Sequence, residues 1–190
     1  MFIQTEATPN PATLKFLPGQ TVIAKGTIDF RSADEAHGKS PLAESLFDLN
    51  GVEGVFFGHD FVTVTKSGDP DWQHMKPAIL GTIMEHFMND QPVMTADVQS
   101  GTETGSGQEF FDAGDEDIVE TIKDLLETRV RPAVAQDGGD ITFRGFKKGV
   151  VYLEMRGACA GCPSSTATLQ HGIQNLLKHF IPQVEAVEAV

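Results

Sequence analysis

The sequence predicts an α+β protein, built from two small α/β domains that are joined by a flexible, acidic, Gly/Ser-rich linker. Residues 95–114 carry four acidic residues, no basic residue and many Gly, Ser and Thr residues, a composition typical of flexible linkers. Patterns typical of strands and of helices alternate on both sides of this stretch. The chain has 190 residues, of which 40% are hydrophobic and 13 are Phe, enough for two small cores. We therefore expect domains at residues 1–94 and 115–190.

The N-terminal domain is predicted to contain several short strands. Runs rich in β-branched and aromatic residues, bounded by proline, glycine or asparagine, are typical of strands. They lie at residues 2–6, 13–16, 27–30, 54–57 and 61–66. The Gly58-His59-Asp60 stretch separates the last two runs and predicts a hairpin between them.

Two helices are predicted in the same domain. Ser40 followed by Pro41 is typical of a helix start, because serine caps the first turn and proline fits the first helical position. We expect this helix to run to about Leu49. The second helix is predicted over residues 71–89, where apolar residues recur at helical spacing, with an interruption or restart at Pro77.

The C-terminal domain is predicted to have the order α-β-β-(CxxC)-α-(β), a small α+β sandwich. Acidic residues at 115–117 favour a helix start, and apolar residues then repeat on one helical face until Pro132. A glycine-rich turn at 137–140 comes next. The remaining elements are a hairpin of strands 141–146 and 150–155, a helix after the cysteines, and an edge strand at 184–190.

The composition argues against two classes of partner. The formal net charge of −13 opposes nucleic-acid binding, because a phosphate backbone requires a cationic surface. No stretch approaches the roughly 20 apolar residues of a membrane-spanning helix. The N-terminus shows neither a secretory signal nor an Arg-rich transit peptide. We therefore expect no nucleic acid, no membrane, and a reducing cytoplasm as the location.

Both cysteines of the chain lie in the stretch R-G-A-C-A-G-C-P-S-S, residues 156–165, where nearly all side chains are very small. Cys162 directly precedes Pro163, so both sulfurs are expected near the free N–H groups at the start of a helix. Such a helix end stabilises a negative charge by about 0.3–1 kcal/mol, too little to hold Cys159 and Cys162 together as thiolates. A cationic metal centre would remove their mutual repulsion.

Counting ligands narrows the choice of metal centre. A structural zinc site takes four protein ligands, and the six histidines show no pair at metal-binding spacing. Iron–sulfur clusters usually take four thiolates, so two chains related by a two-fold axis would be needed to complete the set. The small neighbours would let two loops approach such a cluster and would leave it peripheral.

Two alternatives stay open at this point. A thiol–disulfide oxidoreductase could use Cys159 and Cys162, although a pair of this kind is expected near a βαβ pattern rather than after a hairpin. Its proline would also lie between the cysteines, whereas Pro163 follows them. Two buried core cysteines are the other alternative, and a loop rich in glycine and serine offers little to bury them.

Several motifs resemble those of a known family. The runs D-G-G-D-I (137–141) and M-R-G-A-C-A-G-C-P-S-S-T-A-T-L (155–169) closely resemble the NifU-like C-terminal domain. The runs F-I-Q-T-E-A-T-P-N-P-A-T-L-K-F (2–16) and G-V-E-G-V-F-F-G (51–58) resemble the N-terminal domain of Nfu-type proteins. Together they cover nearly the whole chain, in the order of the two-domain Nfu proteins of α-proteobacteria and mitochondria.

This resemblance implies an iron–sulfur cluster carrier or scaffold rather than a turnover enzyme. Members of the family share a cluster, more often 4Fe–4S than 2Fe–2S, between two protomers and pass it to apo-proteins. The family's ligand positions map onto Cys159 and Cys162. The implied partners are a second copy of the chain, apo iron–sulfur client proteins and upstream assembly factors.

The resemblance leaves two questions to other observations. The N-terminus favours the bacterial, cytoplasmic form, and a mitochondrial matrix location would follow if a transit peptide had been removed. The N-terminal domain has no cysteine, so it supplies no thiolate ligand. We expect it to act as a targeting module that contacts clients or assembly factors.

Overall fold

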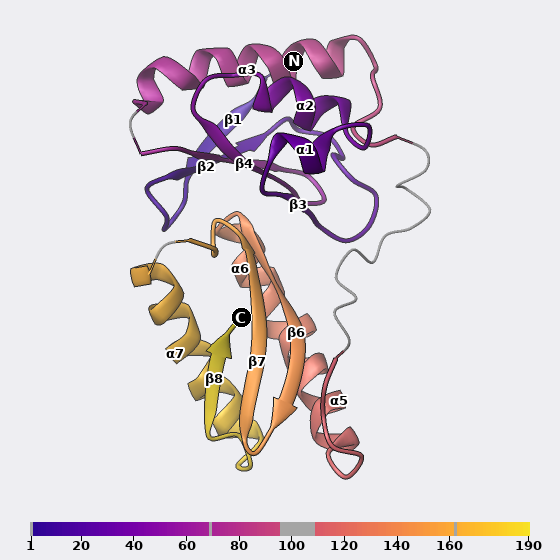
Figure 1. Ribbon diagram of the computed structural model, residues 1–190, viewed down its shortest axis with the longest axis vertical. Helices are drawn as coiled ribbons and strands as arrows, with labels where there is room; N and C mark the ends of the chain where they lie inside the picture. Colours follow the sequence, from indigo (N-terminus) through magenta and orange to yellow (C-terminus); the bar gives the residue numbers. More distant parts are fainter. Residues whose placement is uncertain (1, 69, 96–108, 162) are drawn as a thin grey trace. The chain divides into compact units, whose positions relative to one another are not determined.

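The computed structural model describes residues 2–68, 70–95, 109–161 and 163–190, with the backbone alone at 163–165. The chain divides into two compact units, Met1–Thr104 and Gly105–Val190 (Figure 1). Each unit combines helices with its own β-sheet and has its own hydrophobic core. The predicted α+β class with two domains is therefore confirmed.

The N-terminal unit contains a five-stranded antiparallel sheet in the order β1-β2-β5-β4-β3. All five predicted strands are present, with ends that differ from the predicted ones by one or two residues, and the hairpin between β4 and β5 is confirmed. The strands are β1 (Gln4–Ala7), β2 (Thr13–Leu17), β3 (Ile28–Phe30), β4 (Val52–Phe57) and β5 (Val62–Lys66).

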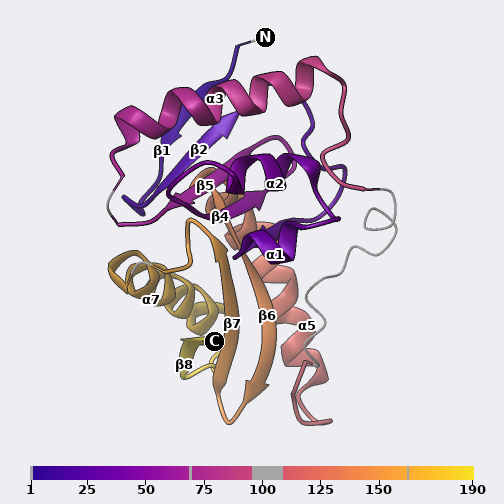
Figure 2. The same cartoon turned by 45° about the horizontal axis from the view of Figure 1, so that its top comes forward.

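The helices of this unit are α1 (Ala33–Ala36), α2 (Pro41–Phe47) and α3 (Trp72–Met88), and Figures 1 and 2 show α2 and α3 on one face of the sheet. Ser40 caps α2, since its Oγ accepts a hydrogen bond from the Ala43 N–H at 3.1 Å. The same Oγ donates to the carbonyl of Val93 at 2.6 Å and so joins the helix start to the end of the unit.

The predicted interruption of the second helix at Pro77 is wrong, because α3 is continuous from Trp72 to Met88. A proline inside a helix removes one backbone hydrogen bond and costs about 3 kcal/mol in an exposed helix. Burial outweighs that cost here, since Met75 precedes Pro77 and the fully buried Ile79 and Ile83 follow it on the face against the core.

The C-terminal unit contains a three-stranded sheet in the order β6-β7-β8. Strands β6 (Gly139–Lys147) and β7 (Val150–Gly157) form the predicted hairpin, and β8 (Ala186–Ala189) is the predicted edge strand, parallel to β7. Gly139 and Asp140 belong to β6 rather than to the predicted turn. Ile141, Leu153 and their same-face neighbours pack with helices α5 (Glu116–Leu125) and α7 (Pro163–Phe180) in one buried cluster.

The predicted end of the first helix of this unit at Pro132 is also wrong. After α5 the chain makes one π-helical turn, η1 (Leu126–Val130), and continues as α6 (Arg131–Gln136). In the wide turn the Arg131 N–H donates to the carbonyl of Leu126, five residues back. Pro132 lies in the first turn of α6, directly after the wide turn, where the regular hydrogen-bond pattern of the helix is already interrupted.

The predicted linker, residues 95–114, falls mostly outside the described residues, which resume at 109. Its last residues contact the C-terminal unit, since Phe110 forms an isolated β-bridge with Gly145. Within the part of the chain that the structure describes, no helix is both long enough and apolar enough to cross a membrane.

His86 in α3 predicts how the N-terminal unit responds to pH. Its side chain is 4% exposed, and its Nε2 has no hydrogen-bond partner among the described residues. Burial lowers the pKa of His86 below 6.5, and hydrogen bonds with the backbone of Gln91 and Pro92 oppose this only in part. As the pH falls, His86 is therefore protonated in the unfolded chain before it is protonated in the folded protein. The free energy of unfolding consequently decreases below about pH 6.5.

We expect His86→Gln to reduce this loss of stability between pH 7 and pH 5. Urea unfolding at a series of pH values measures it, and the slope of stability against pH is the quantity to compare. His74→Gln, on the exposed side of the same helix, should leave the slope as in the wild type. An equal slope in wild type and His86→Gln would contradict the assignment.

Candidate functional site

The cysteine-containing loop connects the end of β7 to the start of α7. One glycine with positive φ lies on each side of Cys159: Gly157 has a φ of 61° and Gly161 a φ of 80°. Residues with a side chain rarely adopt this backbone conformation, so glycine suits both positions. The loop thereby turns sharply out of the strand and again before the helix. Cys162, the second predicted ligand, lies outside the described residues.

Cys159 is buried, with 6% of its surface exposed, and belongs to the hydrophobic cluster of the C-terminal unit. The interpretation that this loop offers little to bury a cysteine is therefore wrong for Cys159. The reason is Gly139 on the neighbouring strand. A Cβ at Gly139 would lie 2.6 Å from the Cys159 Sγ and 2.7 Å from the Arg156 carbonyl oxygen, so the sulfur fills space that only glycine leaves open.

Backbone hydrogen bonds fix the loop in this place. The Ala158 N–H donates to the carbonyl of Gly138 at 3.1 Å, and the Ala160 N–H donates to the carbonyl of Gly157 at 3.1 Å. The Thr166 hydroxyl, in the first turns of α7, donates to the carbonyl of Cys159 at 3.1 Å. The start of β6, the loop itself and α7 therefore all hold the segment that carries Cys159.

An ion pair joins the start of β6 to α6. Arg131 donates from both Nε and a terminal nitrogen to the two carboxylate oxygens of Asp140, each at 2.8 Å. Asp140 is 3% exposed and also accepts a hydrogen bond from the Ile141 N–H at 2.9 Å. The hydrogen bond with Asp140 raises the pKa of Arg131, which therefore stays charged.

This pair was not predicted from the sequence, because residues 137–140 have a composition typical of a turn. Opposite charges on Arg131 and Asp140, with Pro132 and a Gly-Gly sequence between them, were the available pattern. Their pairing could not be derived from the sequence, because it depends on the π-helical turn that sets where Arg131 points.

A second charged cluster lies on strands β6 and β7 of the same sheet. Glu154 accepts hydrogen bonds from Arg144 and from Arg156, the latter at 3.1 Å. Burial alone would raise the pKa of Glu154, but the hydrogen bonds from the two arginines outweigh it and hold the pKa below its usual value. The cluster fixes Arg156, the residue just before Gly157 and the loop.

The electrostatic surroundings of Cys159 favour the neutral thiol. Burial raises the pKa of Cys159 to about 12, and the charges of Asp137 and Asp140 act in the same direction. The small stabilisation of a thiolate expected from the helix start is therefore outweighed at Cys159 by burial and by the two carboxylates. The nucleophile in thiol–disulfide exchange is a thiolate, so a thiol with this raised pKa is poorly suited to the oxidoreductase alternative.

The chemistry open to this loop is that of a soft sulfur ligand. Thiolates bind zinc, copper(I) and iron–sulfur clusters, and small neighbours such as Ala158 and Ala160 leave the backbone close to such a group. Binding displaces the thiol proton, so the positive charge of a metal centre must offset the repulsion between the thiolate and the nearby carboxylates. Among the described residues, no three His, Cys, Asp or Glu side chains gather so that they could hold a metal ion.

Comparison with known proteins assigns both units. Residues 3–90 match the family described as scaffold protein Nfu/NifU N terminal, and residues 122–188 match the NifU-like domain. A solution NMR structure of a NifU-like protein from Saccharomyces cerevisiae is 30% identical, with a TM-score of 0.46, and covers 50% of this chain and 86% of that one.

Two curated relatives match over 191 residues and 100% of this chain. A human protein named NFU1 iron-sulfur cluster scaffold homolog, mitochondrial, is 49% identical, and the match covers 72% of its length. A Drosophila erecta protein of the same name is 50% identical, and the match covers 65% of its length, so the chain spans about two thirds of that relative. The chain thus belongs to the Nfu family, with an Nfu/NifU N-terminal domain followed by a NifU-like domain.

Proposed function

We propose that the protein is an iron–sulfur cluster scaffold and carrier that binds its cargo through Cys159 and Cys162 and passes it to apo-proteins, without acting as an enzyme. The observation that carries the proposal is the seating of Cys159 against Gly139, in a loop of small residues that the β-hairpin and α7 hold in place. Membership in the Nfu family supports it, as do the names of the human and Drosophila relatives.

The ligand count favours a shared site. An iron–sulfur cluster usually takes four thiolates, whereas the chain has two cysteines. Two copies of the chain would complete the set with a two-fold symmetric contact. We infer a 4Fe–4S cluster between two protomers, with a 2Fe–2S cluster as the lesser alternative, and a homodimer in the loaded state.

The raised pKa of Cys159 fits a carrier better than a permanent holder. Its thiolate is costly in the folded apo-protein, because burial and the charges of Asp137 and Asp140 favour the protonated form. Part of the binding free energy of the cargo is therefore used to remove a proton. The affinity of Cys159 for its cargo is therefore lower than it would be if its free thiolate were already stabilised.

The relatives also bear on location. Both relatives carry "mitochondrial" in their names, which agrees with the matrix alternative, whereas they give no support to a bacterial cytoplasm. We propose the mitochondrial matrix as the compartment of this protein, with apo iron–sulfur clients and upstream assembly factors as its partners there.

Anaerobic reconstitution with iron and sulfide tests the cluster site. We expect roughly two irons and two sulfides per chain in a dimer, as four irons shared by two chains require. Cys159→Ser and Cys162→Ser should each abolish iron binding and dimer formation, while His171→Ala, an exposed position on α7, should change neither. Metal analysis, visible absorption and mass in solution are the measurements. Zinc in a dimer, or disulfide reduction without iron binding, would overturn the proposal.

Gly139→Ala tests the seating of the sulfur. The added Cβ would lie within 3.0 Å of the Cys159 Sγ and of two backbone atoms, so the loop has to shift. Overpacking of this kind costs about 1–3 kcal/mol, and we expect a lower melting temperature and a clear loss of bound iron after reconstitution. Gly172→Ala in α7 is the matched control, since nothing lies within 4 Å of its added Cβ. Full iron loading in Gly139→Ala would show that the seat is dispensable.

Deletion of residues 1–94 tests the N-terminal unit as a targeting module. This unit has a hydrophobic core of its own and no cysteine, so its loss should leave iron binding intact. A tethered contact with a client raises the effective concentration of the cargo, so delivery should become slower for at least some clients. Transfer to purified apo-proteins, followed by the recovery of their activity, measures this. Unchanged transfer to every client would rule the targeting role out.

A further inference from the structure

Residues 109–111 lie along the free edge of the C-terminal sheet. β6 is an edge strand in the order β6-β7-β8, and an edge presents unpaired backbone groups to other chain segments. The Phe110 N–H donates to the carbonyl of Arg144 at 3.1 Å, and the Phe146 N–H donates to the carbonyl of Phe110 at 2.8 Å. The two bonds form one parallel bridge, between Phe110 and Gly145. The segment therefore adds the beginning of a fourth strand.

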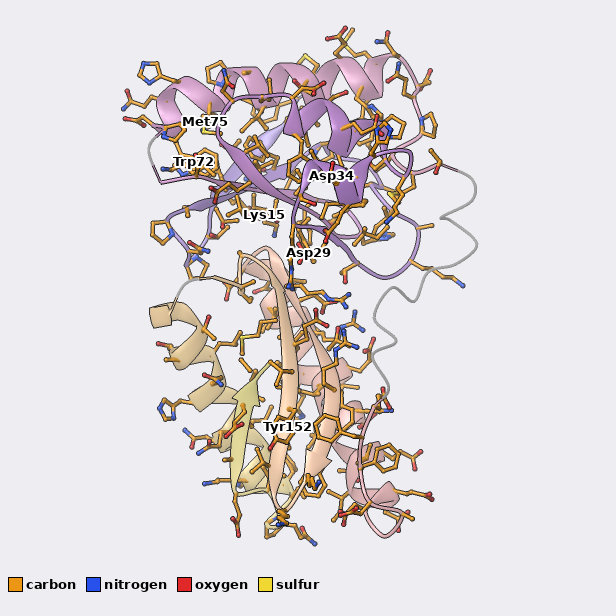
Figure 3. All side chains as sticks on the ribbon, in the orientation of Figure 1. Lys15, Asp29, Asp34, Trp72, Met75 and Tyr152 are labelled. Atoms are coloured by element: carbon orange, nitrogen blue, oxygen red, sulfur yellow. The ribbon has the colours of Figure 1, made fainter. Side chains whose placement is uncertain are left out.

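The edge is shaped to receive an aromatic side chain. Gly145 lies at a register shift of the β6–β7 hairpin, and a Cβ there would lie 2.5 Å from the ring of Phe110. The ring also packs against Tyr152 on β7, the only tyrosine of the chain, which Figure 3 labels. The two ring centroids are 5.1 Å apart. The absent side chain at Gly145 and the Tyr152 ring thus form an aromatic seat.

The surroundings of the seat attract negative charge. Lys123 on α5 forms an ion pair with Glu109, the residue before Phe110, at 2.5 Å. Lys147, at the end of the same strand β6, is exposed. Cations are scarce in a chain of net charge −13, so their presence at this edge favours an acidic segment there.

The present occupant is held by few contacts. Phe110 remains 44% exposed and Phe111 remains 38% exposed, and one bridge joins the segment to β6. Both side chains of the ion pair between Lys123 and Glu109 are about two fifths exposed, so solvent screens it. An occupant of this kind is one that a competing segment can replace.

We propose that the β6 edge is a peptide-binding site, which takes an extended segment of a partner protein with an acidic residue followed by an aromatic one. Residues 109–111 occupy the site in the free protein. The partner would add its strand to β6 through the same two backbone bonds and place its aromatic ring in the seat. Because residues 109–111 are covalently attached to the site, they compete with a partner peptide at a high effective concentration. This concentration is in the millimolar range for short tethers.

A fluorescein-labelled peptide of sequence G-S-G-Q-E-F-F-D-A-G, the stretch 105–114, tests the proposal with the full-length apo-protein. We expect Phe110→Ala, which vacates the seat, to bind the peptide at least about 10-fold more tightly than the wild type does, because the attached competitor is weakened. Glu109→Lys, which breaks the ion pair with Lys123, should give a smaller increase. Fluorescence anisotropy measures the binding.

Two controls separate the seat from nonspecific attraction. In Phe110→Ala/Gly145→Ala the added methyl group fills the seat without meeting a ring, so the fold should persist and peptide binding should fall at least about 10-fold. The peptide G-S-G-Q-E-A-F-D-A-G should bind Phe110→Ala as weakly as the original peptide binds the double variant. Equal binding to wild type and Phe110→Ala, or to the single and double variants, would overturn the proposal. These measurements need no iron, so they are independent of cluster binding.

Discussion

The seating of the Cys159 sulfur against Gly139 is the contact around which the C-terminal unit is arranged. It requires a position without a side chain on β6 and a loop that returns over that position. The antiparallel register supplies both, since Gly139 pairs with Gly157 at the end of the hairpin. The ion pair between Arg131 and Asp140 then holds the start of β6 against α6, so the glycine cannot drift away from the sulfur. A loop of small residues thus acquires a defined shape from its neighbours rather than from its own side chains.

In this arrangement the position of the Cys159 thiol is fixed, while its ionisation to a thiolate is unfavourable. Packing fixes the place of the thiol, while burial and two carboxylates keep it protonated. A protein that stores a metal centre would gain from the reverse, a thiolate stabilised by helix dipoles and cations. The preference for the neutral thiol is consistent with the proposed carrier role, in which the cargo is later passed on. The N-terminal unit, which lacks cysteine and has a closed core of its own, contributes nothing to this balance through ligands.

Much of the fold could be predicted from the sequence, because period-two and helical patterns report on which side chains are buried. The strands of the N-terminal sheet, the hairpin β6–β7 and the edge strand β8 were all predicted in this way. The two errors, at Pro77 and Pro132, arise because proline is typical of a helix end. Pro132 lies in the first turn of α6, directly after the wide turn, whereas Pro77 lies inside α3. Proline is unfavourable inside a helix, but its cost is small beside the burial of apolar side chains, as at Ile79 and Ile83, which a local pattern does not weigh.

The residues of the candidate site could be predicted from the sequence, but their surroundings in the fold could not. Spacing and ligand count identified Cys159 and Cys162 as the candidate pair, and Cys162 lies outside the described residues. The burial of Cys159 could not be foreseen, since it depends on Gly139, twenty residues earlier in the chain and adjacent only through the hairpin. The docking of Phe110 could not be derived from the sequence for the same reason, because its seat is an absent side chain at Gly145.

The π-helical turn between α5 and α6 has a consequence for how this chain can vary in length. An α-helix turns by about 100° per residue, so the same residues wound without the wide turn would point Arg131 away from Asp140. The helix thus contains one residue more than a regular spiral needs between its two buried stretches. Loss of a residue between Leu126 and Val130 would be absorbed by a return to the regular spiral, whereas loss of one in α5 or α6 would turn one helix relative to the other. Deletions in this helix are therefore tolerable at the wide turn and damaging one turn away from it.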